Sequence, residues 1–291
     1  MKELLVLSGK GGTGKTSLTA SFVSLADQCI ACDYDVDASN LPILLKPDKT
    51  QGQEFSAGLV AVLNKDICIE CGLCRDLCRF DAISSEYQIS ELSCEGCAFC
   101  AEVCPVEAIE MQDRSSGRWF ESNSHVNGKL VPIFYAELRP GEENSGLLVA
   151  QVKSAARKKA QQEGYSLLIS DGSPGIGCPV ISSLVEASLV LIVTEPSVSG
   201  FHDLKRVQEL LELRGVKSIL LINKADLNLP ASQAMEKWAQ DNGIPVAGRI
   251  PYSKELAAVV SGGQVPVSQP ELHELILPVW QKIRKELEKV N

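Results

Sequence analysis

The sequence is poor in histidine, in aromatic side chains and in long hydrophobic runs. It has 3 histidines, and aromatic residues make up 5% of its 291 positions. No apolar stretch approaches the roughly 20 residues of a membrane-spanning helix, so we expect no membrane partner. The formal net charge is −9, and Lys and Arg are not gathered into a stripe with stacking aromatics. That pattern argues against a nucleic-acid partner.

The first residues also lack the pattern of a secretory signal peptide. Met1–Glu3 lead straight into the short apolar run Leu4–Leu7 and then into a glycine-rich loop. Eleven cysteines without an export signal are typical of a reducing cytoplasm, where thiolates act as ligands and do not form disulfides. We therefore expect a cytoplasmic protein.

Most of the cysteines form two closely spaced runs. Soft thiolates favour iron–sulfur clusters or zinc over hard cations. Zinc ribbons use cysteine pairs at wide separation, whereas each run here has four cysteines and no surplus histidine. The spacing therefore favours two [4Fe–4S] clusters, with structural zinc as the alternative. The runs are Cys68-x2-Cys71-x2-Cys74-x3-Cys78 and Cys94-x2-Cys97-x2-Cys100-x3-Cys104-Pro105.

The two runs resemble a bacterial-type two-cluster ferredoxin. In such ferredoxins three cysteines of a run hold one cluster and the fourth crosses to the other. The first run lacks the proline that follows the fourth cysteine of the second, which bears on the local turn and on the potential of one cluster. The resemblance assigns Cys68, Cys71, Cys74 and Cys104 to cluster 1, and Cys94, Cys97, Cys100 and Cys78 to cluster 2.

A phosphate-binding loop follows the first apolar run. Leu4–Leu7 is read as a buried parallel strand, and an apolar-periodic helix extends to about Asp27. Strand, glycine loop and helix give the G-x-x-x-x-G-K-[ST] motif its required context. Lys15 should meet the β- and γ-phosphates, and Thr16 should hold Mg²⁺. The predicted nucleotide-binding residues are Gly11, Gly12, Thr13, Gly14, Lys15, Thr16 and Ser17.

A second lysine makes the loop similar to the deviant Walker A motif of the MinD/ParA family. Lys10-Gly-Gly-Thr-Gly-Lys15-Thr16 carries the resemblance, and the family includes nitrogenase iron proteins and Mrp-type iron–sulfur carriers. The resemblance implies a dimer that faces itself across two ATP molecules. It also implies that Lys10 stabilises phosphate charge in the partner's site, as an arginine finger does. The alternative for Lys10 is a solvated loop lysine.

Acidic residues follow two further predicted strands. Cys29–Cys32 reads as a buried strand, and the segment after it is similar to the family's switch I. The resemblance places Asp35 where a carboxylate orients the attacking water, and Asp33 at the Mg²⁺ shell or the loop. Asp37 could serve a similar role, and one sequence does not rank the three. Residues 165–171 form a Walker B pattern, in which Asp171 should bind Mg²⁺ through water.

Three more residues take a role from the resemblance alone. Asn223 matches the family position that pairs with adenine, and Pro251 lies in a segment similar to the one that closes over the base. A turn-forming Asn and Pro is the alternative for both. Cys178 lies where nitrogenase-type iron proteins hold a cluster shared between subunits. Its alternatives are a role in transient metal transfer and a packed loop thiol.

These features predict an α/β fold with an insertion. The frame is a P-loop NTPase whose mostly parallel sheet has helices on both faces, at residues 1–64 and 113–291. A small α+β two-cluster ferredoxin domain occupies 65–112. The amphipathic stretch Leu277–Val290 is read as a helix packed on the sheet, in preference to a membrane-targeting helix.

The function predicted is that of a Mg²⁺-dependent ATPase, slow without its partner, whose dimer switching is coupled to two [4Fe–4S] clusters. It would act in metallocofactor or iron–sulfur protein assembly, as a homodimer or with a related ATPase. The first alternative is an ATP-gated electron donor to a redox partner protein. The second is a positioning ATPase like ParA or MinD.

Overall fold

The computed structural model describes residues 1–142 and 145–290, which form two compact units. The first unit comprises Met1–Gln53, Trp119–Glu137 and the chain from Ser145 onward, and the second comprises Glu54–Arg118 and Leu138–Asn144. The predicted ATPase segment 113–291 also contains residues 143, 144 and 291, which lie outside the described residues. The predicted insertion 65–112 falls within the second unit, and its bounds stay a prediction.

The predicted α/β architecture is confirmed by a nine-stranded, mostly parallel sheet in the order β3-β4-β5-β2-β6-β1-β7-β8-β9. Parallel pairing joins β1 to β6 and β7, β2 to β5 and β6, and β8 to β7 and β9. The strands of the first unit are β1 (Lys2–Ser8), β2 (Ile30–Asp33), β5 (Lys129–Leu138), β6 (Leu167–Pro174), β7 (Leu189–Thr194), β8 (Ser218–Asn223) and β9 (Val246–Ile250).

The centre of this sheet is built from continuous apolar runs, as strands covered on both faces require. Leu4–Leu7 of β1 are fully buried, and every residue of β7 is buried as well. Because β1 lies between β6 and β7, the loops after these three strands meet at one edge of the sheet. That edge is where open α/β sheets bind their ligands.

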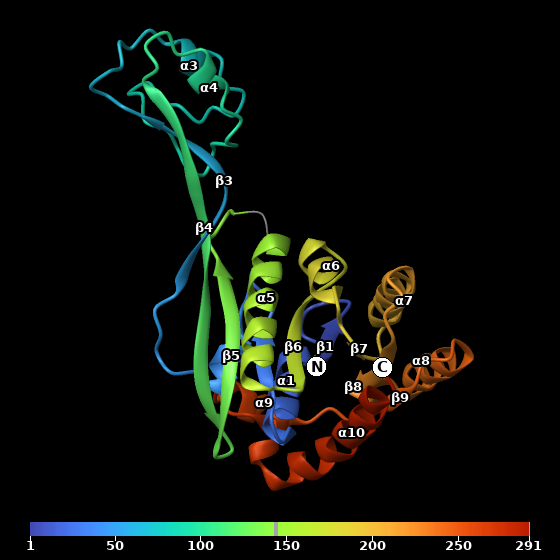
Figure 1. Ribbon diagram of the computed structural model, residues 1–291. Coiled ribbons are helices and arrows are strands. Elements are labelled where there is room, and N and C mark those ends of the chain that lie inside the picture. Colours follow the sequence, from blue (N-terminus) through green and yellow to red (C-terminus); the bar gives the residue numbers. More distant parts are fainter. Residues whose placement is uncertain (143–144, 291) are drawn as a thin grey trace. The chain divides into compact units, whose positions relative to one another are not determined.

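Helices cover both faces of the sheet (Figure 1). On one face α1 and α10 pack with Leu4 and Val6 in the main core, where Phe22 stacks on Trp280 at 5.5 Å between ring centroids. The C-terminal stretch therefore packs on the sheet, as predicted. The helices of this unit are α1 (Lys15–Leu25), α2 (Leu41–Leu45), α5 (Ser145–Glu163), α6 (Cys178–Leu184), α7 (Val198–Leu213), α8 (Leu229–Asp241), α9 (Lys254–Ser261) and α10 (Pro270–Glu288), with 3₁₀ turns η1 (Ala225–Asn228) and η2 (Pro266–Ser268).

The second unit contains β3 (Gln53–Leu63), the first part of β4 (Ile109–Val126), and the short helices α3 (Leu73–Asp76) and α4 (Phe99–Glu102). A small core of its own joins the strands to the cysteine segments, and it includes Val60, Ile83, Cys74, Cys94 and Ile109. After β4 the chain makes a hairpin turn into β5, with Asn127 and Gly128 both at positive φ. Among the described residues, no helix is long and apolar enough to cross a membrane.

Candidate functional site

The glycine-rich loop connects the buried end of β1 to the first turn of α1. Gly12 and Gly14 have φ angles of 79° and 90°, a conformation that glycine adopts without steric cost. A Cβ added to Gly14 would lie 2.4 Å from Asn223 Nδ2, so the loop is also packed too tightly there for a side chain. The sequence thus places glycine where the loop needs both properties.

Lys15 lies among carboxylates at the start of α1. Its Nζ is 2.9 Å from Asp171 Oδ1 and 3.9 Å from Asp35 Oδ2. Thr16 Oγ1 donates a hydrogen bond to Asp171 Oδ2 at 2.6 Å, and Thr19 Oγ1 donates to Asp171 Oδ1 at 3.1 Å. Burial favours the neutral amine, but the surrounding carboxylates, Asp171 first, outweigh it and raise the pKa of Lys15. The Walker A lysine and the Walker B aspartate therefore hold each other.

The two acidic residues after β2 face different surroundings. Both carboxylate oxygens of Asp33 accept hydrogen bonds within the following loop, from the backbone N–H of Asp35, Ser39 Oγ and the backbone N–H of Leu41. Burial, reinforced by the Asp171 carboxylate, raises the pKa of Asp33 to about 7. Asp35 instead lines the cavity in front of the glycine loop. Asp33 orders the loop, and Asp35 faces the space where a nucleotide would lie.

This nucleotide cavity has a volume of about 740 Å³. All seven loop residues predicted to bind nucleotide contribute to its lining, and Asp35, Asp37 and Asn40 close it from the segment after β2. Backbone N–H groups of a glycine loop and the N-terminus of a long helix form a site for phosphate. The cavity has the chemistry that a magnesium nucleotide requires, and the role of each residue in it stays a prediction.

Lys10 lies beside the end of β7. Its Nζ is 2.6 Å from Glu195 Oε1 and donates hydrogen bonds to Ser197 Oγ at 3.2 Å and Ser199 Oγ at 3.0 Å. Lys224 Nζ binds the other oxygen of Glu195 at 3.0 Å and also donates to Gly12 O at 2.9 Å. Partial burial acts in the opposite direction, yet the two ammonium groups lower the pKa of Glu195.

Asn223 and Pro251 fall outside the nucleotide cavity's lining as far as the described residues go. Asn223 Nδ2 donates to Thr13 O at 2.7 Å, and its Oδ1 accepts from the Lys224 N–H. The Asn223 side chain is thus hydrogen-bonded to the backbone of the glycine loop. Its pairing with adenine stays a prediction. Pro251 is exposed after β9. Cys178 is an exposed thiol at the start of α6.

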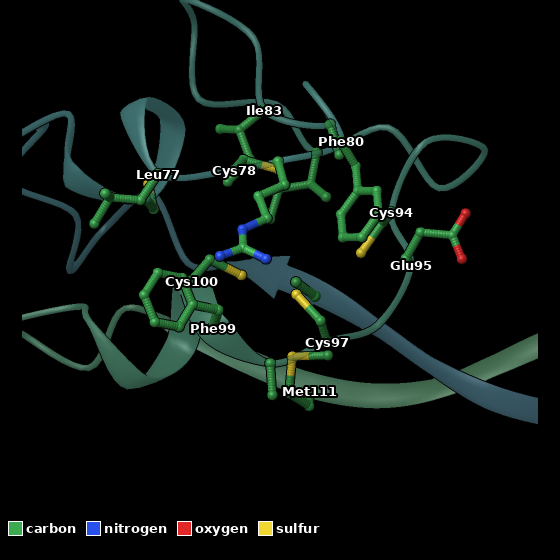
Figure 2. A pocket seen from close by; sticks show the side chains of 16 residues that line it. Leu77, Cys78, Phe80, Ile83, Cys94, Glu95, Cys97, Phe99, Cys100 and Met111 are labelled. Atoms are coloured by element: carbon green, nitrogen blue, oxygen red, sulfur yellow. The ribbon is translucent and has the colours of Figure 1, made fainter.

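The eight cysteines of the second unit line two cavities. One, here the first cysteine cavity, has a volume of about 10 Å³ and the other, the second cysteine cavity, about 320 Å³ (Figure 2). Each brings together the four cysteines that the crossed pairing predicts for one cluster. The first is lined by Cys68, Cys71, Cys74 and Cys104, and the second by Cys78, Cys94, Cys97 and Cys100; Cys74 lines the second cavity as well.

The two cysteine runs, here also called half-repeats, have the same backbone conformation at matching positions. Glu70 and Gly96, each two residues after the first cysteine of its run, are at positive φ. Gly72 and Ala98, each directly after the second cysteine, are also at positive φ and begin α3 and α4. These turns point successive thiols toward a common centre. Ala98 adopts this conformation although it has a Cβ, which indicates that the surrounding fold imposes it.

The lining chemistry fits clusters better than a single ion. Backbone N–H groups donate to thiol sulfurs, from Glu70 to Cys68 Sγ at 3.4 Å and from Ala108 to Cys104 Sγ at 3.2 Å, and such bonds stabilise cluster thiolates. Apolar side chains such as Ile83, Ile89 and Met111 complete the second cysteine cavity. Within the described ranges, no three Cys, His, Asp or Glu side chains converge on one ion. A cubane does not need such convergence, because each cysteine binds a different iron.

Comparison with known proteins identifies a domain family, a relative and similar folds. Residues 61–111 match the 4Fe-4S dicluster domain family. The uncharacterized protein MJ0578 of Methanocaldococcus jannaschii is 36% identical over 229 residues, which span 78% of this chain and 79% of that protein. The MinC:MinD cell division complex of Aquifex aeolicus matches with a TM-score of 0.58 at 16% identity, over 98% of this chain and 96% of that one.

A second solved structure shares the fold. The septum site-determining protein MinD of Pyrococcus horikoshii, complexed with Mg-ADP, has a TM-score of 0.56 at 17% identity and covers 97% of this chain and 95% of its own. This chain belongs to one family with MJ0578. It has the MinD/ParA-type P-loop ATPase fold and carries a 4Fe–4S dicluster ferredoxin domain.

The sequence alone did not identify the residues outside the glycine loop whose side chains contact the loop and Asp171. Glu195 and Lys224 clamp Lys10 and Gly12, and Thr19 adds a third hydrogen bond to Asp171. The signal available in the sequence was weak, since an acid at a strand end is common. The position of Glu195 directly after the apolar run of β7 was the clue to its place at the site edge.

Proposed function

We propose that the protein is a Mg²⁺-dependent ATPase whose dimer switching is coupled to two [4Fe–4S] clusters, in the assembly or reduction of a metallocofactor or iron–sulfur protein. One observation carries the proposal. A single chain holds a phosphate-loop cavity with its lysine and acidic residues, and also two cavities that the eight cysteines of the two runs line. The MinD relative of Pyrococcus horikoshii, which is complexed with Mg-ADP, supports the nucleotide part.

In the nucleotide cavity each side chain has a defined task. Lys15 leaves Asp171 and neutralises the β- and γ-phosphates, because the phosphate oxygens offer it the negative charge that the carboxylate now supplies. Thr16 and Asp171, already hydrogen-bonded to each other, are left to hold Mg²⁺. Asp35 orients the attacking water from the cavity wall. Lys10 leaves Glu195 and reaches the phosphates of the facing subunit.

The second unit would hold its clusters permanently. When bound, they supply one-electron transfer. Four thiolates from this chain surround each cavity, and apolar side chains limit water at the sulfurs, which favours retention over release. An electron donor to a partner enzyme is therefore the second candidate function, and internal ligation is the observation that favours it. A purely positional role fits the likeness to MinD but leaves the cysteine cavities without a task.

The experiment is anaerobic reconstitution followed by two measurements on the same sample. Iron and sulfide content is determined before and after MgATP turnover, and reduction potentials are measured with MgATP and with MgADP. A nucleotide-dependent potential with constant iron supports redox coupling. Loss of iron to an apo-acceptor only during turnover supports cluster delivery. Potentials and iron content that both ignore nucleotide would reject the coupling and leave the positional role.

A further inference from the structure

The second cysteine cavity differs from the first at one charged position. Pro105 follows the fourth cysteine of the second run, and Arg79 takes the corresponding place after Cys78. Arg79 lines the second cysteine cavity, whereas Pro105 is not part of the lining of either cavity among the described residues. The cavity that contains the arginine is the larger of the two, about 320 Å³ against about 10 Å³. The half-repeats are therefore alike in backbone but not in charge.

Arg79 is also the arginine of this unit that lacks a carboxylate partner among the described residues. The other four arginines each have a carboxylate oxygen within 4.0 Å. Those pairs are Arg75 with Asp76 at 3.0 Å, Arg114 with Glu142 at 2.8 Å, Arg118 with Glu54 at 2.6 Å and Arg139 with Glu54 at 3.8 Å. Lys65, also without such a partner among the described residues, lies outside the lining of both cysteine cavities.

An unpaired arginine is unexpected in so acidic a unit. The segments 54–118 and 138–144 contain 14 acidic and 6 basic residues, so this part of the chain carries most of the net charge of −9. Glu95 lines the same cavity, but its carboxylate points away from Cys94 and Cys97 in Figure 2. Carboxylates are abundant in the unit, and yet Arg79, an exposed residue, lines the cavity of the cysteines. The negative charge that would complete its pairing is that of a thiolate-bound cluster.

We infer that Arg79 tunes the cluster held by Cys78, Cys94, Cys97 and Cys100, and gives it a higher reduction potential than its twin. The inference rests on the proposed function, because it assumes that both cavities hold clusters. Reduction by an external one-electron donor adds one negative charge to a cluster, and a cation at the cavity stabilises that charge. The first electron then resides at the second cysteine cavity. Arg79 does not ligate the cluster in this inference; its positive charge acts on the cluster's reduction potential.

The test is a potentiometric measurement followed by EPR on reconstituted full-length protein, with three variants. Arg79→Gln removes the cation, Arg79→Lys keeps it, and Arg118→Gln removes an equal charge that is paired with Glu54 in the same unit. Wild type should show two separated one-electron steps. Arg79→Gln should move the higher step to lower potential, so that the reduced-to-oxidised ratio at a fixed potential falls roughly twofold to fivefold, the size of a partly exposed charge pair. Arg79→Lys and Arg118→Gln should retain the separation.

Three results would overturn the inference, and each has a different meaning. If all variants hold iron for two clusters and Arg79→Gln leaves both steps in place, Arg79 has no tuning role although the proposed function stands. If the wild-type protein holds no clusters after reconstitution, the proposed function and this inference both fail. A shift of equal size in Arg118→Gln would also count against the inference, since it would show a response to net charge alone.

Discussion

Lys10 Nζ lies 2.6 Å from Glu195 Oε1 within the same subunit. The contact exists because β1 and β7 are parallel neighbours, so the residues that follow each strand meet at one edge of the sheet. Lys224 shares the same carboxylate from the end of β8. Lys10, which we propose to act in the facing subunit, is thus paired with Glu195 of its own chain. It must leave this carboxylate to reach the phosphates of the facing subunit.

Replacing this lysine should separate nucleotide binding from turnover. In Lys10→Ala the nucleotide cavity keeps Lys15, Thr16 and its glycine backbone, so MgATP binding should be close to wild type. Hydrolysis should fall by at least about a thousandfold, the lower end of the range that arginine fingers supply. Equilibrium binding of a fluorescent ATP analogue and phosphate release measure the two effects. Hydrolysis at the normal rate would defeat the cross-subunit role.

Removing the charge of Glu195 should favour the dimer. Glu195→Gln leaves Lys10 its hydrogen bonds to Ser197 and Ser199 but removes the ion pair. Because the pair is partly exposed, its loss is worth about 0.2–1 kcal/mol, and dimerisation in MgATP should tighten by up to about fivefold. Sedimentation velocity measures this, with Glu212→Gln on α7 as a matched control. A weaker dimer in Glu195→Gln would show that the contact supports the loop and does not restrain Lys10.

Loss of the Walker A lysine should remove nucleotide binding. Lys15→Ala deletes the charge-assisted bonds to phosphate, each worth about 1.5–3 kcal/mol, and leaves Asp171 and Asp35 facing the phosphates unopposed. Binding of MgATP should fall by at least about a hundredfold in isothermal titration calorimetry. Iron content should be unchanged, since the cysteine cavities lie in the other unit. Retained affinity would place the nucleotide elsewhere.

A buried ion pair between β1 and α5 should contribute strongly to stability. The carboxylate of Glu3 is fully buried, 2.8 Å from Lys153 Nζ and 3.2 Å from Arg157, and it accepts bonds from Tyr34 and Ser170. Glu3→Ala leaves the buried Lys153 without its counter-charge and should cost about 3–5 kcal/mol in urea unfolding. The double variant Glu3→Met/Lys153→Met should recover much of this loss. A cost under about 1 kcal/mol for the single variant would contradict the pairing.

The crossed pairing of cysteines predicts which cluster each variant loses. Cys104 lies in the first cysteine cavity, so Cys104→Ser should lose that cluster and keep the one beside Arg79. Cys78→Ser should do the reverse. Iron content should drop to about half in both, and the remaining EPR signal should have the higher potential only in Cys104→Ser. The reverse assignment, with the higher-potential signal remaining in Cys78→Ser and lost in Cys104→Ser, would show that the fourth cysteines do not cross. Cys178→Ser, at an exposed thiol outside the cysteine runs, is the control.

The parts of the site that are local in sequence could be predicted from it. Gly12, Gly14 and Lys15 lie in one loop, and the positive φ angles of that loop require glycine. The apolar run of β1 indicates the strand before it. The cysteine spacing similarly predicts two four-cysteine groups, because three cysteines of each run hold one cluster and the fourth crosses to the other. Asn127-Gly128 predicts a hairpin turn, because a two-residue hairpin needs positive φ at both positions and this residue pair adopts it readily.

Contacts between distant strands could not be predicted in this way. Glu195 meets Lys10, and Asn223 meets Thr13, only because the sheet order places β7 and β8 beside β1. One sequence gives the strands but not their order. It also did not separate Asp33 from Asp35, since the loop after β2 decides which carboxylate is consumed by backbone N–H groups and which faces the cavity. That Arg79 has no carboxylate partner within the described part of the chain likewise depends on where the other four arginines of its unit lie.

The most direct test is the EPR-monitored reduction of the reconstituted protein in MgATP and in MgADP, with Lys15→Ala beside it. If nucleotide state and cubane centres communicate, the potentials of wild type will differ between the two nucleotides, and those of Lys15→Ala will not. Identical potentials in a wild-type sample shown to bind both iron and MgATP would contradict the account.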